Sequence, residues 1–480
     1  MRLEEYAAHD GLALAKLVRE GQVTPAELAH LAVRGAERTE PRLGAIAGLY
    51  DDAVESAEAA EPGPFHGVPV LLKDLFHGDA GRPTEAGSRL AEGWVAQVQS
   101  ELVRRVRACG MVPVGRATTS EFGVMGTTET VACGPTSTPW SGDHMAGGSS
   151  GGSGAAVGAG IVPIATGSDG GGSIRIPASA CGVVGLKTSR GRVTWAPAAG
   201  EPLLGWAVHH VLTRSLRDTA ACLDELAAPY PGEPFTLPGP PDGGWLDQLR
   251  MQPGPLCIAV CWQPWSGADV VDEIRAACEA TAALLSGLGH ELVEASPRFS
   301  WEQFLDAMTV IWSSTTAQTV DGFAQAVGRE PSPDNLELPT FRMVEFGRAV
   351  KVGELLNAID SAGYVSRQAR GFFQEYDLLL TPTLGALPAR LGTYRPDEEL
   401  EPKQLFGSWA HLESFLPVFN ASGQPAISLP LHMSEQGLPI GMQLVGASGA
   451  ESVLLRLAAQ LEEAAPWSAR RPPLYAGSAT

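Results

Sequence analysis

The chain has 480 residues, of which 44% are hydrophobic and 18% are charged, a composition typical of a globular protein with a large core. Its formal net charge of −20 repels phosphate backbones, so we do not expect nucleic acid as a partner. The N-terminal sequence lacks the basic and apolar regions of a signal peptide, and no run of 18 apolar residues occurs, so we expect a cytoplasmic protein that does not enter membranes.

The hydrophobic pattern predicts an α/β fold in one large domain over 1–480. Residues 1–60 are predicted to be helical, with a capping box from Thr24 to Glu27. A core with strands and helices follows over 61–230, and a surface connection rich in Pro and Gly covers 231–255.

Residues 256–480 are predicted to combine a variable helical region with C-terminal strands. Short apolar runs predict strands, and longer periodic segments predict helices. We expect strands at 256–262, 291–293, 378–380, 426–429 and 442–445, and helices across about 270–287, over 300–376 and from Glu451. Strands interleaved with helices favour a mixed central sheet that is covered by helices on both sides.

The seven cysteines are scattered along the chain and form neither a disulfide framework nor a CxxC pair. This distribution indicates thiols in a reducing compartment. We expect neither a metal nor an organic cofactor.

The segment 147–153, GGSSGGS, has three competing interpretations. A flexible linker is disfavoured because the apolar sequence AAVGAGIVPIAT follows directly. A phosphate loop is disfavoured because no Lys-Ser or Lys-Thr pair follows the last glycine. A nucleophile elbow around Ser149 would need a hydrophobic strand just before it, and 141–144 (SGDH) makes a poor strand.

A second segment, GSDGGGSIRIP at 167–177, follows an apolar strand. Three consecutive glycines allow successive N–H groups to point into one concavity. A serine at the end of such a turn, here Ser173, can attack a carbonyl while those N–H groups stabilise the oxyanion.

Serine needs a base that takes its proton, and neither serine motif contains a histidine. Lys73 ends the apolar run 68–72, and burial there would favour its neutral form. An ordinary solvated lysine at the end of a strand remains the alternative.

The segments 67–74, 147–153 and 167–177 together resemble the amidase signature family. The similarity continues through 182–187, 420–427 and 438–441, so it covers most of the chain. The segments PVFNASGQPAISLP and AAQLEEAAPW look most like those of family members that act on nylon oligomers.

The resemblance implies a role for each matching residue. Ser173 would be the acylated nucleophile, Lys73 the base, and Ser149, which usually follows a cis peptide bond in this family, the proton relay between them. The oxyanion hole would consist of the N–H groups of Gly170, Gly171, Gly172 and Ser173. Ser150, Asp169 and Arg175 would orient the loops, with a purely structural salt bridge as the alternative for Arg175.

Substrate choice is expected to depend on 195–215 and 300–350, which diverge from the family pattern. Candidate pocket residues are Met125, Trp195, Trp206, Trp312 and Phe341. Packing in the core is the alternative for each of them.

The resemblance implies hydrolysis of linear or cyclic carboxamides through an acyl-enzyme, with anilides, esters and carbamates as further candidate substrates. A small-molecule amide would be the ligand, and the family expectation is a homodimer. Two alternatives stay open: the catalytic subunit of a glutamine-dependent tRNA amidotransferase, and a non-catalytic binding protein on the same fold.

Overall fold

A mixed sheet of eleven strands runs through the computed structural model, which describes residues 1–235 and 237–478. The strand order is β1-β3-β2-β8-β10-β9-β14-β15-β13-β11-β12. The strands of this sheet are β1 (Ile46–Leu49), β2 (Pro69–Lys73), β3 (Val112–Ala117), β8 (Ile164–Asp169), β9 (Val184–Lys187), β10 (Val208–Thr213), β11 (Cys257–Val260), β12 (Glu291–Glu294), β13 (Leu378–Pro382), β14 (Ala426–Met433) and β15 (Pro439–Gly446). Two small ribbons pair β4 (Glu129–Thr130) with β5 (Gly134–Pro135), and β6 (Ser137–Thr138) with β7 (Ser141–Met145).

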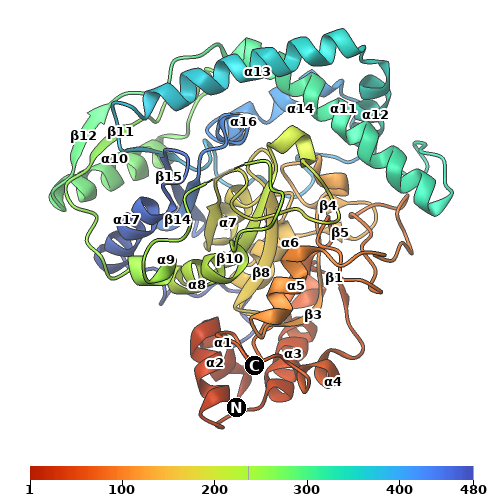
Figure 1. The fold of residues 1–480 in the computed structure, drawn as a ribbon, viewed down its shortest axis with the longest axis vertical. Helices are drawn as coiled ribbons and strands as arrows, with labels where there is room; N and C mark the ends of the chain where they lie inside the picture. The colour runs from red at the N-terminus through yellow and green to blue at the C-terminus, as the bar shows by residue number, and fades with distance from the viewer. Residues whose placement is uncertain (236, 479–480) are drawn as a thin grey trace.

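Helices cover both faces of the sheet, as the sequence predicted. They are α1 (Leu3–Ala8), α2 (Gly11–Arg19), α3 (Pro25–Leu43), α4 (Ala53–Ala57), α5 (Glu101–Ala108), α6 (Gly151–Gly158), α7 (Arg175–Cys181), α8 (Leu216–Leu226), α9 (Gly244–Gln248), α10 (Asp272–Gly287), α11 (Trp301–Val327), α12 (Leu338–Ala349), α13 (Val352–Phe372), α14 (Pro402–Ser408), α15 (Ala410–Glu413), α16 (Val418–Ser422) and α17 (Glu451–Ala464), with short turns η1 (Glu121–Gly123) and η2 (Pro202–Gly205). Helices α11 to α13 gather at one end of the molecule, opposite α1 to α4 (Figure 1).

The sheet is mixed because it contains both parallel and antiparallel pairs. Strand β2 is parallel to both β3 and β8, and β11 is parallel to both β12 and β13. The central strands β8, β10, β9, β14 and β15 pair antiparallel to one another. This confirms the predicted α/β fold with a mixed sheet.

Alternating side chains of the strands divide the core between the two faces of the sheet. In β13, Leu378 and Leu380 join one hydrophobic cluster, and Leu379 joins the other. This follows from the two-residue period of a strand. The second cluster contains the buried face of α11, including Trp312.

The predicted capping box at the start of α3 is confirmed. The hydroxyl of Thr24 accepts the N–H of Glu27 at 3.2 Å, and the Glu27 carboxylate accepts the N–H of Thr24 at 2.8 Å. The two ends of the chain lie near this helix (Figure 1), and the hydroxyl of Tyr475 donates to the carbonyl of Ala7.

Three predictions of local structure were wrong. The first sixty residues contain the strand β1, because this segment pairs with the edge of β3. The connection 231–255 contains the short helix α9. Residues 141–144 do form a strand, β7, but it pairs with β6 in a separate ribbon and is largely exposed, so it is not the buried strand of a nucleophile elbow.

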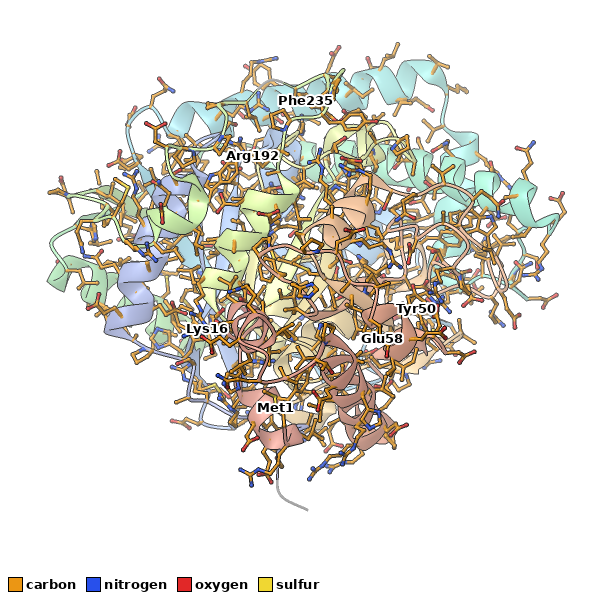
Figure 2. The ribbon with its side chains drawn as sticks, turned by 60° about the horizontal axis from the view of Figure 1, so that its bottom comes forward. Met1, Lys16, Tyr50, Glu58, Arg192 and Phe235 are labelled. Atoms are coloured by element: carbon orange, nitrogen blue, oxygen red, sulfur yellow. The ribbon has the colours of Figure 1, made fainter. Side chains whose placement is uncertain are left out.

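Charged and polar side chains project from the face formed by the N-terminal helices, around Met1, Lys16 and Glu58 (Figure 2). Within the described residues, no helix combines the length and the apolar character needed to cross a membrane.

We predict that two helical glycines respond oppositely to alanine. A Cβ at Gly152 in α6 would lie 2.4 Å from the backbone nitrogen of Thr118 and 2.5 Å from the carbonyl oxygen of Ala45. Gly152→Ala should therefore lower the free energy of unfolding by about 1–3 kcal/mol, as overpacking does. The control Gly353→Ala in α13 meets no atom within 4 Å and should raise it by up to about 1 kcal/mol. Urea unfolding checks both, and equal destabilisation would contradict the packing account.

Candidate active site

The site lies where β2 and β8, which are parallel neighbours in the sheet, end side by side. Lys73 is the last residue of β2, and Asp169 is the last residue of β8. The backbone N–H of Lys73 donates to Thr166 Oγ1 at 2.9 Å, so β8 fixes the position of the lysine directly.

The ammonium end of Lys73 contacts two serine hydroxyls. Its Nζ donates to Ser168 Oγ at 2.9 Å and makes a second hydrogen bond of 2.7 Å with Ser149 Oγ. The side chain is 1% exposed. Burial lowers the pKa of Lys73 to about 7, against the opposing effect of the Asp169 charge. A lysine of this kind can exchange a proton near neutral pH.

The loop before α6 presents Ser149 to the lysine. The peptide bond between Gly148 and Ser149 is cis, as the family resemblance implied. The carbonyl of Ser149 accepts the N–H of Ser120 at 3.2 Å. The loop is therefore attached to η1 on its other side.

Ser150 joins this loop to the loop that carries Ser173. Its hydroxyl donates to the carbonyl of Ser168 at 3.2 Å and accepts the N–H of Ser168 at 3.3 Å. Its own N–H donates to the carbonyl of Ser173 at 3.3 Å. The two serine segments, far from Lys73 in sequence, are thereby held against the same strand.

The carboxylate of Asp169 closes the turn after β8. It accepts the N–H groups of Gly172 at 2.8 Å and Ile174 at 3.2 Å. It also accepts Arg175 Nε and Nη2, both at 2.9 Å, and both side chains of this ion pair are fully buried. Burial acts to raise the pKa of Asp169, but Arg175, together with Lys187 and Asn420, outweighs burial and holds the pKa well below its usual range.

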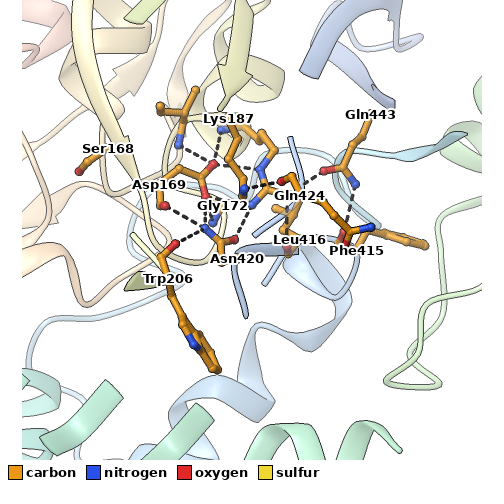
Figure 3. Close-up of polar contacts among 12 residues, drawn as sticks. Ser168, Asp169, Gly172, Lys187, Trp206, Phe415, Leu416, Asn420, Gln424 and Gln443 are labelled. Carbon is orange, nitrogen blue, oxygen red and sulfur yellow. Dashed lines mark hydrogen bonds and ion pairs between the residues drawn. The ribbon is translucent and has the colours of Figure 1, made fainter. Parts of the chain in front are cut away.

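The other donors of Arg175 reach the C-terminal part of the chain. Its guanidinium donates to Asn420 Oδ1 at 2.6 Å and Gln443 Oε1 at 2.8 Å. Asn420 Nδ2 in turn donates to the carbonyl of Asp169 at 2.8 Å (Figure 3). The ion pair therefore orders the serine loop against α16 and β15.

Gly172 differs from its predicted role. Its N–H is already bonded to the Asp169 carboxylate, so it is not free to bind a substrate oxyanion. A Cβ at Gly170 would lie 2.5 Å from Leu203 Cδ1, and a Cβ at Gly171 would lie 2.9 Å from the ring of Trp312, so a side chain at either position would require these neighbours to shift.

A large cavity of about 870 Å³ opens onto Ser149, Ser168 and Ser173. Its walls are mainly apolar and include Phe76, Trp94, Phe122, Trp195 and Leu203. Among the described residues that line it, Glu201 alone is charged. The hydroxyl of Ser173 makes no hydrogen bond within the described part of the chain, and the residue is 8% exposed.

A second, much smaller cavity of about 10 Å³ also touches Ser173. Met125 lines this cavity, Trp195 lines the large one, and Trp312 lines both, as do Gly123 and Ser173.

Trp206 and Phe341, the other two candidates, line neither cavity. Trp206 is buried and stacks on Phe304 with a distance of 5.8 Å between the ring centroids. Trp206 therefore packs in the core, which was the alternative to a place in the pocket.

Sequence reasoning missed two residues of the site. The hydroxyl of Ser168 binds Lys73 Nζ. Ser168 follows Thr166 by two residues in β8, so the two-residue period of a strand places both hydroxyls on the same side of the strand, and Thr166 also contacts Lys73. Asn420 connects Asp169 with Arg175, but it is about 250 residues away, and no local signal relates it to them.

In the described residues, no group of three or more His, Cys, Asp or Glu side chains could hold a metal.

Comparison with known proteins finds relatives that are named as amidases or amide hydrolases. The sequence model of the family described as Amidase matches residues 27–455. A 6-aminohexanoate-cyclic-dimer hydrolase of Pseudomonas sp. (strain NK87) is 37% identical over 97% of this chain and 96% of its own. The solved structure of 6-aminohexanoate cyclic dimer hydrolase has a TM-score of 0.93 at 35% identity, covering 98% of this chain and 99% of its own. A bacterial aryl acylamidase structure has a TM-score of 0.83 at 26% identity, covering 96% of this chain and 97% of its own.

The fold and these relatives define a hydrolase that acts on carbon–nitrogen bonds. More particularly, the chain belongs to the amidase family. The resemblance that the three sequence segments indicated is confirmed, and so is the predicted similarity to 6-aminohexanoate cyclic dimer hydrolase.

We predict that Arg175→Met destabilises the protein strongly. The variant leaves the buried Asp169 carboxylate without its cation, and loss of one partner of a buried pair costs about 3–5 kcal/mol. Urea unfolding measures the change. The control Arg395→Met removes an exposed ion pair with Asp397 and should leave the unfolding midpoint unchanged. A similar midpoint for both variants would show that the Asp169–Arg175 pair does not stabilise this site.

Proposed function

We propose that this amidase hydrolyses small-molecule carboxamides by acyl transfer to Ser173, with Ser149 and Lys73 moving the proton. One observation carries the proposal: the buried Nζ of Lys73, whose pKa is lowered to about 7, lies 2.7 Å from Ser149 Oγ. A neutral amine in this position can accept the proton that a serine nucleophile must lose.

In the first step, Ser173 Oγ forms a bond to the amide carbonyl carbon. Its proton moves to Ser149 Oγ while the Ser149 proton moves to Lys73 Nζ. The proton then returns through Ser149 to the amide nitrogen, the carbon–nitrogen bond breaks and the amine leaves. Water attacks the resulting ester and loses its proton along the same path, which releases the acid and restores Ser173.

The developing oxyanion would be bound by the N–H groups of Gly170, Gly171 and Ser173, whereas Gly172 holds the turn through Asp169. Asp169, Ser150 and Arg175 would act as positioning residues, because their contacts order the two serine loops.

The large cavity favours amides with an apolar part over glutamine. Glutamine carries a carboxylate that needs a cationic partner, and no Lys or Arg lines either cavity within the described residues. This supports an independent amide hydrolase over a component of a tRNA amidotransferase.

Two further proposals concern the protein as a whole. We propose a cytoplasmic location, which seven free thiols support, and a homodimer.

Ser173→Ala should abolish hydrolysis. We expect wild-type protein to release acid from at least one member of a panel of linear amides, cyclic amides, anilides, carbamates and glutamine. Loss of the nucleophile should lower kcat by about 10³-fold or more. Ser141→Ala, in the ribbon strand β7, is the matched control and should keep wild-type kcat. Full activity of Ser173→Ala would refute the acyl-enzyme assignment.

The pH dependence should report the ionisation of Lys73. Below its pKa of about 7 the amine is protonated and cannot accept a proton, so kcat/KM should fall as the pH decreases through about 7. Above this pH the neutral amine predominates and the rate should reach a plateau. Steady-state rates of a neutral amide from about pH 5.5 to about pH 9 test this.

The arginine variant supplies the matched comparison for that profile. Lys73→Arg keeps a permanent charge and should lose about 10²–10⁴-fold in kcat. Lys16→Arg, on the exposed side of α2, should keep the profile. If Lys73→Arg kept full activity and its kcat/KM still fell as the pH decreased through about 7, the ionisation would belong to a group other than Lys73.

A further inference from the structure

The small cavity beside Ser173 holds a carboxyl group that no proposed catalytic step uses. Glu413, the last residue of α15, lines this cavity together with Ser173 and Trp312. The Glu413 side chain has no hydrogen bond or ion pair within the described residues. It is therefore available to a group inside the cavity.

The rest of the cavity wall suits a small cation. The aromatic rings of Trp312, Phe406 and Trp409 line it, and Glu413 is the one ionisable residue among the described lining. Aromatic faces attract ammonium groups, and a carboxylate pairs with them. A volume of about 10 Å³ is at the lower limit for one group of the size of a water molecule, so the cavity admits at most one small group, such as an ammonium, and not an extended chain.

The positions of the serines decide which part of an amide enters each cavity. The leaving nitrogen must receive its proton from Ser149, and Ser149 lines the large cavity but not the small one. The amine part of the substrate therefore occupies the large apolar cavity. The acyl part is directed to the other side of Ser173, towards Glu413.

We propose that Glu413 binds the α-ammonium group of the acyl part, so that the preferred substrates are amides of small α-amino acids with large apolar amines. This inference rests on the proposed acyl transfer to Ser173. Glu413 is then a specificity-determining residue, and Trp312 contacts both the acyl side and the amine side.

The charges around Glu413 are compatible with this role. Burial raises the pKa of Glu413 to about 8, Arg175 lowers it and Asp169 raises it. Because Arg175 and Asp169 are paired with each other, neither neutralises Glu413. An ammonium group in the cavity would favour the ionised carboxylate and form the missing ion pair.

Two 4-nitroanilides that differ by a single amino group test the inference. Glycine 4-nitroanilide carries the α-ammonium, and 4-nitroacetanilide lacks it; release of 4-nitroaniline is followed for both. We expect wild-type kcat/KM to favour the glycine substrate by about tenfold or more, the value of a charge-assisted contact. Glu413→Gln should reduce this ratio by about tenfold or more, mainly through KM. Glu462→Gln, a half-buried carboxyl outside both cavities, should keep the wild-type ratio.

The outcomes separate this inference from the proposed function. Hydrolysis that depends on Ser173 but shows no wild-type preference for the glycine substrate overturns the role of Glu413 and leaves the acyl-enzyme proposal intact. A preference that survives in Glu413→Gln also overturns it. No Ser173-dependent hydrolysis of any amide overturns both.

Discussion

The buried ion pair between Asp169 and Arg175 is the contact on which the rest of the site depends. The carboxylate ends β8 and uses its oxygens to hold the N–H groups of the turn that carries Ser173. The guanidinium uses its remaining donors on Asn420 and Gln443, which belong to the C-terminal part of the chain. Because neither charge has access to water, each needs all of these partners. One interaction thus fixes the loop and joins it to the rest of the fold.

The same carboxylate sets a limit on how far the pKa of Lys73 can fall. Burial of the lysine disfavours its charged form, whereas the negative charge of Asp169 favours it. The result is a pKa near neutrality, at which an amine can both accept and return a proton. The hydroxyls of Ser149 and Ser168 both contact Nζ, so the buried amine is not left without hydrogen-bond partners.

Much of the fold and of the candidate site could be predicted from local sequence. Apolar runs of four to eight residues located most strands, and the glycine-serine segments located Ser149 and Ser173. Strand β1 was missed because its pairing with β3 compensates for a weak local pattern. Trp206 was assigned to the pocket because an aromatic residue has the same appearance in a core and in a cavity wall; only its stacking on Phe304 decides.

The sequence by itself pointed to the family and to the candidate residues Lys73, Ser149 and Ser173, because they stand in the segments that carry the resemblance to the amidase family. Only the tertiary structure decided how that chemistry is arranged. Hydrogen bonds and burial depend on residues that are distant along the chain, so the sequence could not show that the Gly172 N–H is bound to Asp169 or that Glu413 lines the same small cavity as Ser173. Local sequence specifies the reacting groups, whereas long-range packing specifies their environment and therefore their pKa values and the shape of the cavities.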